Sequence, residues 1–133
     1  RNETLASVMR RFRICEERGS GIDKVIFQAE LLQLPAPLFE VPEGFTRTVL
    51  FAHRTLSKMD KTDRVRAVYQ QACLRYVNRQ YLTNASTRER FGIEPANRAT
   101  ASRLIRDTLE AGLIRLINED AADKMRAYVP YWA

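Results

Sequence analysis

The chain has 133 residues, of which 45% are hydrophobic and 29% charged, and its formal net charge at pH 7 is +6. No apolar run approaches the roughly 18–20 residues that a membrane-spanning helix needs, so no such helix and no membrane partner are expected. The two cysteines, Cys15 and Cys73, form no CxxC pair, which argues against a zinc site or a disulfide framework. Free, buried thiols in a reducing cytoplasm are expected instead.

The excess positive charge is confined to the second part of the sequence. Residues 1–52 hold seven basic and seven acidic side chains, whereas residues 53–133 hold the remaining 15 basic and 9 acidic ones. Because phosphate backbones attract cationic side chains, residues 53–133 are the better candidate for contact with nucleic acid.

Two helices are predicted at the start of the chain. Apolar residues recur at helical spacing over residues 3–15 and again over residues 22–34. Gly19-Ser20-Gly21 separates the two helices, and Pro35 ends the second.

A β-hairpin and a linker are predicted next. Branched and aromatic residues favour strands over residues 39–41 and 45–52, with a turn between them. Residues 53–62 carry several charges but no clear period, which indicates a linker or an exposed connection. Residues 1–52 are therefore interpreted as a small helix-hairpin segment of α+β class. It is expected to form the C-terminal part of an upstream domain of the same protein.

Residues 63–133 show the order of elements that is typical of a winged helix-turn-helix domain. Three helices and two strands are predicted here, over residues 63–78, 84–91, 96–111, 113–117 and 127–131. Tyr81-Leu82-Thr83 is short and strand-like, and Gly92 and Gly112 end the second and third helices. The polar loop over residues 118–124 has the size of a wing. The predicted fold class is α+β throughout.

The third helix of this domain, residues 96–111, is the predicted recognition helix. With Ile105 at the centre of its buried face, Thr100 and Arg103 lie nearly opposite and Arg106 lies at the flank. The exposed N-terminal half of the helix is therefore expected to offer Asn97, Arg98, Thr100 and Arg103. In helix-turn-helix proteins such a face meets base edges, where an arginine can form a bidentate contact with guanine. The alternative interpretation is that these arginines only solvate an exposed helix face.

Four more basic residues are predicted to contact the DNA backbone or its minor groove. Arg88 and Arg90 lie on the second helix, which crosses the backbone in this class of fold. Lys124 and Arg126 lie in or beside the predicted wing. Ordinary surface charge is the alternative explanation for each of them.

No catalytic or cofactor site is predicted. Gly19-Ser20-Gly21 can hold a phosphate at a helix start, but a plain turn is favoured because no GxGxxG or P-loop motif is present. His53 has no Asp, Ser or Cys arranged with it as a triad. The expectation is therefore a protein that is not an enzyme, with no catalytic residue, no metal and no cofactor.

Short motifs in the first 51 residues follow a known family pattern in order. They are Arg1-Asn2, Leu5-Ala6, Glu16-Glu17-Arg18-Gly19-Ser20-Gly21-Ile22, Leu34-Pro35-Ala36-Pro37, Phe39-Glu40 and Val49-Leu50-Phe51. This pattern resembles the C-terminal part of bacterial proteins labelled RecG-related helicases or Schlafen/AlbA-type transcriptional regulators, in a segment grouped with histidine-kinase-like ATPases. The resemblance implies a nucleic-acid-binding domain upstream and, often, a winged helix downstream.

Together these patterns predict a bacterial, cytoplasmic transcriptional regulator that binds double-stranded DNA as a homodimer, without covalent chemistry. Two alternatives remain open. The chain can belong to an ATP-dependent, helicase-related DNA-processing protein, or its winged helix can serve as a protein-interaction or dimerisation module. The regulator is placed first because the sequence contains no Walker motif and no helicase box.

Overall fold

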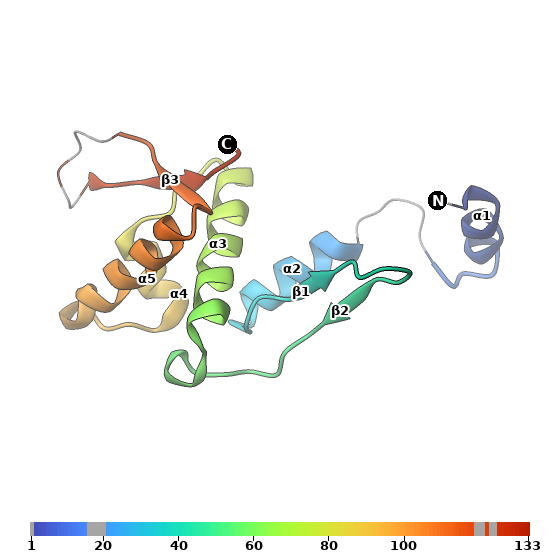
Figure 1. The fold of residues 1–133 in the computed structure, drawn as a ribbon, viewed down its shortest axis with the longest axis horizontal. Coiled ribbons are helices and arrows are strands. Elements are labelled where there is room, and N and C mark those ends of the chain that lie inside the picture. Colours follow the sequence, from blue (N-terminus) through green and yellow to red (C-terminus); the bar gives the residue numbers. More distant parts are fainter. Residues whose placement is uncertain (1, 16–20, 119–121, 123–124) are drawn as a thin grey trace.

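The computed structural model describes residues 2–15, 21–118, 122 and 125–133, and Figure 1 shows their arrangement. In chain order the elements are α1 (Glu3–Arg11), α2 (Gly21–Leu31), β1 (Leu38–Glu40), β2 (Arg47–Val49), the 3-10 helix η1 (Leu56–Lys58), α3 (Lys61–Val77), α4 (Asn84–Phe91), the 3-10 helix η2 (Pro95–Asn97), α5 (Arg98–Glu110), β3 (Ile114–Leu116) and β4 (Tyr128–Pro130). The strands pair in two separate antiparallel hairpins. The predicted α+β class is therefore confirmed. Among the described residues, no helix has the length and apolar character that crossing a membrane requires.

Helices α1 and α2 confirm the two helices predicted at the start of the chain, although both are shorter than predicted. The Asn2 side chain accepts a hydrogen bond from the Leu5 amide at 2.9 Å and caps the start of α1. The helix ends at Arg11, and Arg13 follows with a φ of 57°, a left-handed conformation that does not continue a helix. The apolar stripe of α1 is largely exposed in the described structure, so its period predicted the helix but not a packing partner.

The β1–β2 hairpin is also shorter than the predicted pair of strands. Leu38 pairs with Val49 and Glu40 pairs with Arg47 in antiparallel register. Gly44 has a φ of 85° in the turn, a conformation that glycine adopts readily. Within the described residues the hairpin stands as a two-stranded sheet, with no third strand to extend its ladder.

The long helix α3 is central to the C-terminal part of the fold. Asp60 caps its start by accepting a hydrogen bond from the Asp63 amide at 2.7 Å, so the helix begins at Lys61 rather than at Asp63. Residues 53–62, predicted as a linker, contain η1 and the start of α3, and Met59 among them is buried. The chain therefore enters α3 through a partly packed segment.

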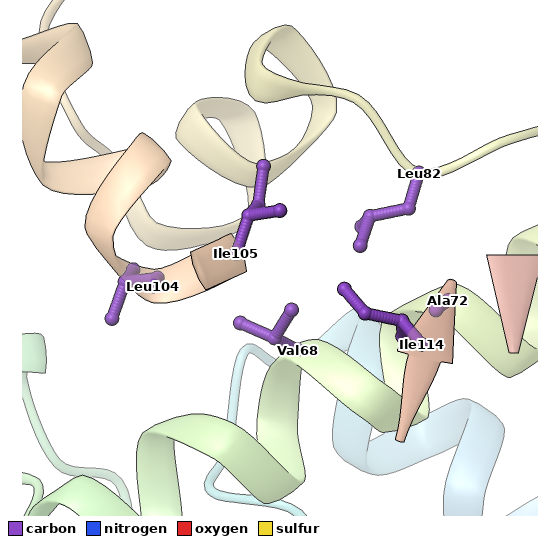
Figure 2. Close-up of a cluster of buried hydrophobic side chains, with 6 residues drawn as sticks. All are labelled: Val68, Ala72, Leu82, Leu104, Ile105 and Ile114. Atoms are coloured by element: carbon purple, nitrogen blue, oxygen red, sulfur yellow. The ribbon is translucent and has the colours of Figure 1, made fainter. Parts of the chain in front are cut away.

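A cluster of buried apolar side chains joins α3, α5 and β3. Its members are Val68, Ala72, Leu82, Leu104, Ile105 and Ile114 (Figure 2). The Leu82 amide donates to the Tyr128 carbonyl oxygen at 3.0 Å, and the Tyr128 amide donates back to the Leu82 carbonyl oxygen at 2.9 Å. This bridge places the strand-like segment predicted around Leu82 beside β4.

Helices α4 and α5 and the β3–β4 hairpin follow α3 in the predicted order. Thr83 and Ser86 form a capping box at the start of α4, and Gly92 ends it with a φ of 60°. Figure 1 shows α5 on one side of α3 and α2 with the β1–β2 hairpin on the other. Most of the loop predicted as a wing, residues 118–124, lies outside the described residues.

Candidate nucleic-acid interface

Helix α5 has one buried face and one exposed, basic face. Its buried side chains are Ala101, Leu104, Ile105 and Thr108. Arg98, Arg103 and Arg106 are exposed, and so is the small residue Ala99 among them. A small side chain at this place allows the helix to approach another surface closely.

The buried face of α5 is rotated from the one predicted. At 100° per residue the four buried side chains are centred close to Thr108, about 50° from Ile105. Arg106 therefore lies near the centre of the exposed face rather than at its flank, whereas Thr100 is half-buried at the margin. The Thr108 hydroxyl donates to the Leu104 carbonyl oxygen at 2.8 Å, which satisfies its polar group and allows a threonine in the core.

The ion pair made by Arg106 is weak. Its Nε lies 3.9 Å from Oε1 of Glu110, one turn later on α5, and both side chains are mostly exposed. Surface pairs of this kind contribute about 0–1 kcal/mol, so a phosphate or a guanine edge can displace the glutamate.

Asn84 fixes the position of α4 on α5. Its Nδ2 donates to the Arg98 carbonyl oxygen at 3.0 Å and to the Ser102 hydroxyl at 2.9 Å. Its Oδ1 accepts a hydrogen bond from Nε of Arg88 at 3.0 Å, which holds the half-buried Arg88 side chain along α4. Sequence reasoning does not reveal this role, because an asparagine at a helix start is most simply explained as a cap.

Arg90, predicted as a contact to the DNA backbone, is instead buried between α4 and α2. Its side chain is 4% exposed, and its Nε lies 2.8 Å from Oε1 of Glu30. Its Nη2 donates to the Leu34 carbonyl oxygen at 2.8 Å. The expectation for Arg90 is therefore corrected: it holds α4 against the N-terminal segment and is not available to DNA.

Burial raises the pKa of the Glu30 carboxyl, and the Arg90 guanidinium lowers it by less than burial raises it. Folding thus favours the protonated form of Glu30. Its contribution to stability is present below the unfolded pKa of about 4.5 and is lost as the pH rises through the raised folded pKa.

Glu30→Gln is expected to remove this part of the pH dependence of the free energy of unfolding. Urea unfolding of the parent and of Glu30→Gln from pH 4 to 7 measures the free energy of unfolding of each. If that free energy depends on pH in the same way in both proteins, the prediction is wrong.

Of the remaining predicted contact residues, some are exposed and one lies outside the described part of the chain. Asn97 is exposed in η2, directly before α5, and Arg126 is exposed shortly before β4. Lys124 lies outside the described residues, as do Gly19 and Ser20 of the glycine-rich turn. The predicted residues that the structure brings together are Asn97, Arg98, Thr100, Arg103 and Arg106, with Arg88 joined to them through Asn84.

The cysteines offer no paired site. Cys15 and Cys73 are free, as predicted, although both are half-buried rather than buried. Within the described part of the chain, no group of three or more His, Cys, Asp or Glu side chains is arranged to hold a metal ion. The exposed face of α5 is therefore the strongest candidate site.

Comparison with known proteins concerns the first part of the chain. Residues 1–50 match the family model described as "Putative ATP-dependent DNA helicase recG C-terminal". This match confirms the resemblance predicted for these residues, and the segment is RecG-related. No curated protein and no solved structure matches the chain. The match ends before α3, so it does not bear on α3 to α5 or on the β3–β4 hairpin.

Proposed function

We propose that this chain, whose first 50 residues are RecG-related, is part of a bacterial transcriptional regulator that binds duplex DNA through α5. The observation that supports this proposal most is the exposed basic face of α5. The helix itself lies on the side of α3 away from α2 (Figure 1). In this proposal residues 1–52 form the C-terminal part of an upstream domain, and residues 63–133 form a winged helix-turn-helix domain. Residues 53–62 link the two.

The order and packing of the elements support the winged-helix interpretation. Helix α3 is followed by the Leu82 bridge, then by α4, α5 and the β3–β4 hairpin, all built on one apolar cluster. In helix-turn-helix proteins the helix that corresponds to α5 enters the major groove. The exposed face of α5 then meets the base edges.

Each basic residue of the interface has a proposed partner. Arg103 and Arg106, near the middle of the exposed face, reach guanine O6 and N7. Arg98 and Arg88 contact phosphates, which fix the register of the helix on the duplex. Asn97 and Thr100 lie at the edge of this set and contact bases or phosphates.

A homodimer is the proposed assembly on DNA, in the cytoplasm. Two copies of α5, related by a two-fold axis, suit the half-sites of a palindromic operator. Regulation then proceeds by occupation of the operator, without covalent chemistry.

Replacing Arg103 by alanine is expected to weaken binding to a cognate duplex by about 1–3 kcal/mol and to relax sequence preference. Arg106→Ala should have an effect of similar size, because this residue lies near the centre of the exposed face. The duplex comes from selection on a random pool, and fluorescence anisotropy at several salt concentrations measures affinity. The parent affinity should fall steeply with salt, as phosphate contacts require.

Arg47→Ala is the matched control, because Arg47 is exposed on β2 and pairs with Glu40 on the other side of α3. It should bind the selected duplex as tightly as the parent. If the two α5 variants also bind like the parent, α5 is not the recognition helix. A parent chain that binds no duplex at low salt supports the protein-docking alternative.

The description of the matching family model favours one second candidate, an ATP-dependent DNA-processing protein. Isothermal titration of the chain with ATP and Mg²⁺ tests it. Heat of binding supports this candidate, and its absence rules out nucleotide binding by these 133 residues alone.

A further inference from the structure

Four aromatic side chains form a cluster where the end of the chain packs on α3, and we call them the aromatic platform: Tyr69, Tyr76, Tyr131 and Trp132. The Tyr69 and Tyr131 rings are stacked with centroids 6.3 Å apart, and Trp132 meets Tyr76 edge to face at 5.5 Å. The Trp132 indole Nε1 donates to the Tyr69 hydroxyl at 3.1 Å. These contacts fix the orientation of the rings.

The platform is held rigid but remains open to solvent. Tyr76, Tyr131 and Trp132 keep 37%, 57% and 50% of their surface exposed. Cys73 lies on α3 between Tyr69 and Tyr76 in sequence, and burial raises the pKa of its thiol. Rigid aromatic rings with exposed surface are suited to stacking, because they lose little conformational entropy on binding.

The surroundings of the platform are cationic. Residues 74–82, at the end of α3 and directly after it, contain Arg75 and Arg79 and no aspartate or glutamate. The Arg79 amide donates to the Tyr76 carbonyl oxygen at 2.9 Å, which places the Arg79 main chain beside that of Tyr76 at one edge of the platform. Arg115 donates to the main-chain oxygen of the residue after Trp132, which places it at another edge. Phosphates are therefore attracted to the border of the exposed rings.

We propose that the aromatic platform binds single-stranded nucleic acid, with bases stacked on Trp132 and Tyr131 and phosphates near Arg79 and Arg115. Stacking suits single strands, because every unpaired base offers a π-face that a duplex hides. The cationic border supplies the backbone attraction that such sites share. An acidic protein surface is the other macromolecule that this charge suits, and the experiment separates the two.

This surface is separate from the proposed duplex site. It is built from α3 and the last residues of the chain, whose C-terminus lies at the end of α3 in Figure 1. None of Arg98, Arg103 and Arg106 belongs to it. Single-strand binding is therefore independent of duplex binding by α5.

Trp132 is the sole tryptophan of the sequence, so its fluorescence reports directly on the platform. A short oligothymidylate added to the complete chain at low salt should quench the Trp132 emission. A blunt hairpin duplex at equal nucleotide concentration should quench it much less. An oligouridylate of the same length shows whether the platform prefers DNA or RNA.

Trp132→Leu should weaken binding of a dye-labelled oligothymidylate by about tenfold in anisotropy, whereas Trp132→Phe should retain most of the affinity because it keeps a ring. The Arg103→Ala/Arg106→Ala double variant is the matched control and should lose duplex binding while keeping the quench. Circular dichroism checks that each variant is folded.

An unchanged Trp132 emission at saturating oligonucleotide overturns the inference, whatever the variants do. Equal quenching by polyglutamate also overturns it and assigns the platform to an acidic protein partner. If the parent quenches with oligothymidylate but binds no duplex, the proposed function fails and the single-strand site stands.

Discussion

Arg90→Ala is expected to lower the free energy of unfolding by about 3–5 kcal/mol. The substitution removes one partner of a buried ion pair and leaves Glu30, whose side chain is 18% exposed, without its cation. It also removes the donor to the Leu34 carbonyl oxygen. Since small domains are stable by about 5–15 kcal/mol in total, this loss is large.

Urea unfolding followed by circular dichroism measures this loss. Arg88→Ala is the matched control on the same helix, and it removes one side-chain hydrogen bond, to Asn84, at a cost of about 1 kcal/mol. The double variant Glu30→Leu/Arg90→Met removes both charges while keeping apolar volume, and it should recover most of the stability. If Arg90→Ala costs no more than Arg88→Ala, the ion pair does not hold α4 to α2.

Leu82→Ala is expected to cost about 2–5 kcal/mol. Leu82 is fully buried, and Figure 2 shows its side chain pointing into the cluster that Val68 and Ile114 share. The neighbours come from α3, α5 and β3, so they cannot all close around the smaller side chain and a cavity remains. The backbone bridge to Tyr128 does not need the side chain and should persist.

Leu109→Ala is the control for this prediction, because Leu109 is exposed on α5 outside the apolar cluster. Its cost should stay below about 1 kcal/mol. Thermal unfolding of both variants measures the difference. Equal losses for Leu82→Ala and Leu109→Ala would mean that the cluster around Leu82 is not the main core of the C-terminal part.

The helices of the second part could be predicted because their signals are local. Thr83 and Gly92 cap α4 through contacts within one turn, and the sequence contains everything that such caps require. The strand-like character of Leu82 was visible as well. Its partner Tyr128 is distant in sequence, so the pairing itself was not.

The burial of Arg90 could not be predicted from the sequence. Its carbonyl partner, Leu34, precedes it by 56 residues. Helix α4 buries Ser86, Thr87 and Arg90, so no apolar period indicates which side faces inward. A short polar helix with an arginine near its end therefore looks like a surface helix until the N-terminal segment is placed against it.

The orientation of α5 was predicted only approximately. Apolar spacing identified Leu104 and Ile105 as buried, and both are. It also grouped Thr108 and Leu109 with them; Thr108 is buried, whereas Leu109 is exposed. Hydrophobicity does not separate these two, because Thr108 satisfies its hydroxyl within the helix. The rotation decides that Arg106 faces outward as fully as Arg103.

Helix α4 is fastened at its two ends to different partners, with Arg90 tied to α2 and Asn84 tied to α5. It can therefore transmit force between the RecG-related segment and the arginines of α5. A molecule that displaces α2 strains the Arg90 contacts and shifts α4, and α5 must follow or break its bonds to Asn84. If a molecule that binds beside α2 changes the affinity of α5 for its ligand by some factor, then binding of that ligand to α5 must change the affinity of the chain for the molecule by the same factor.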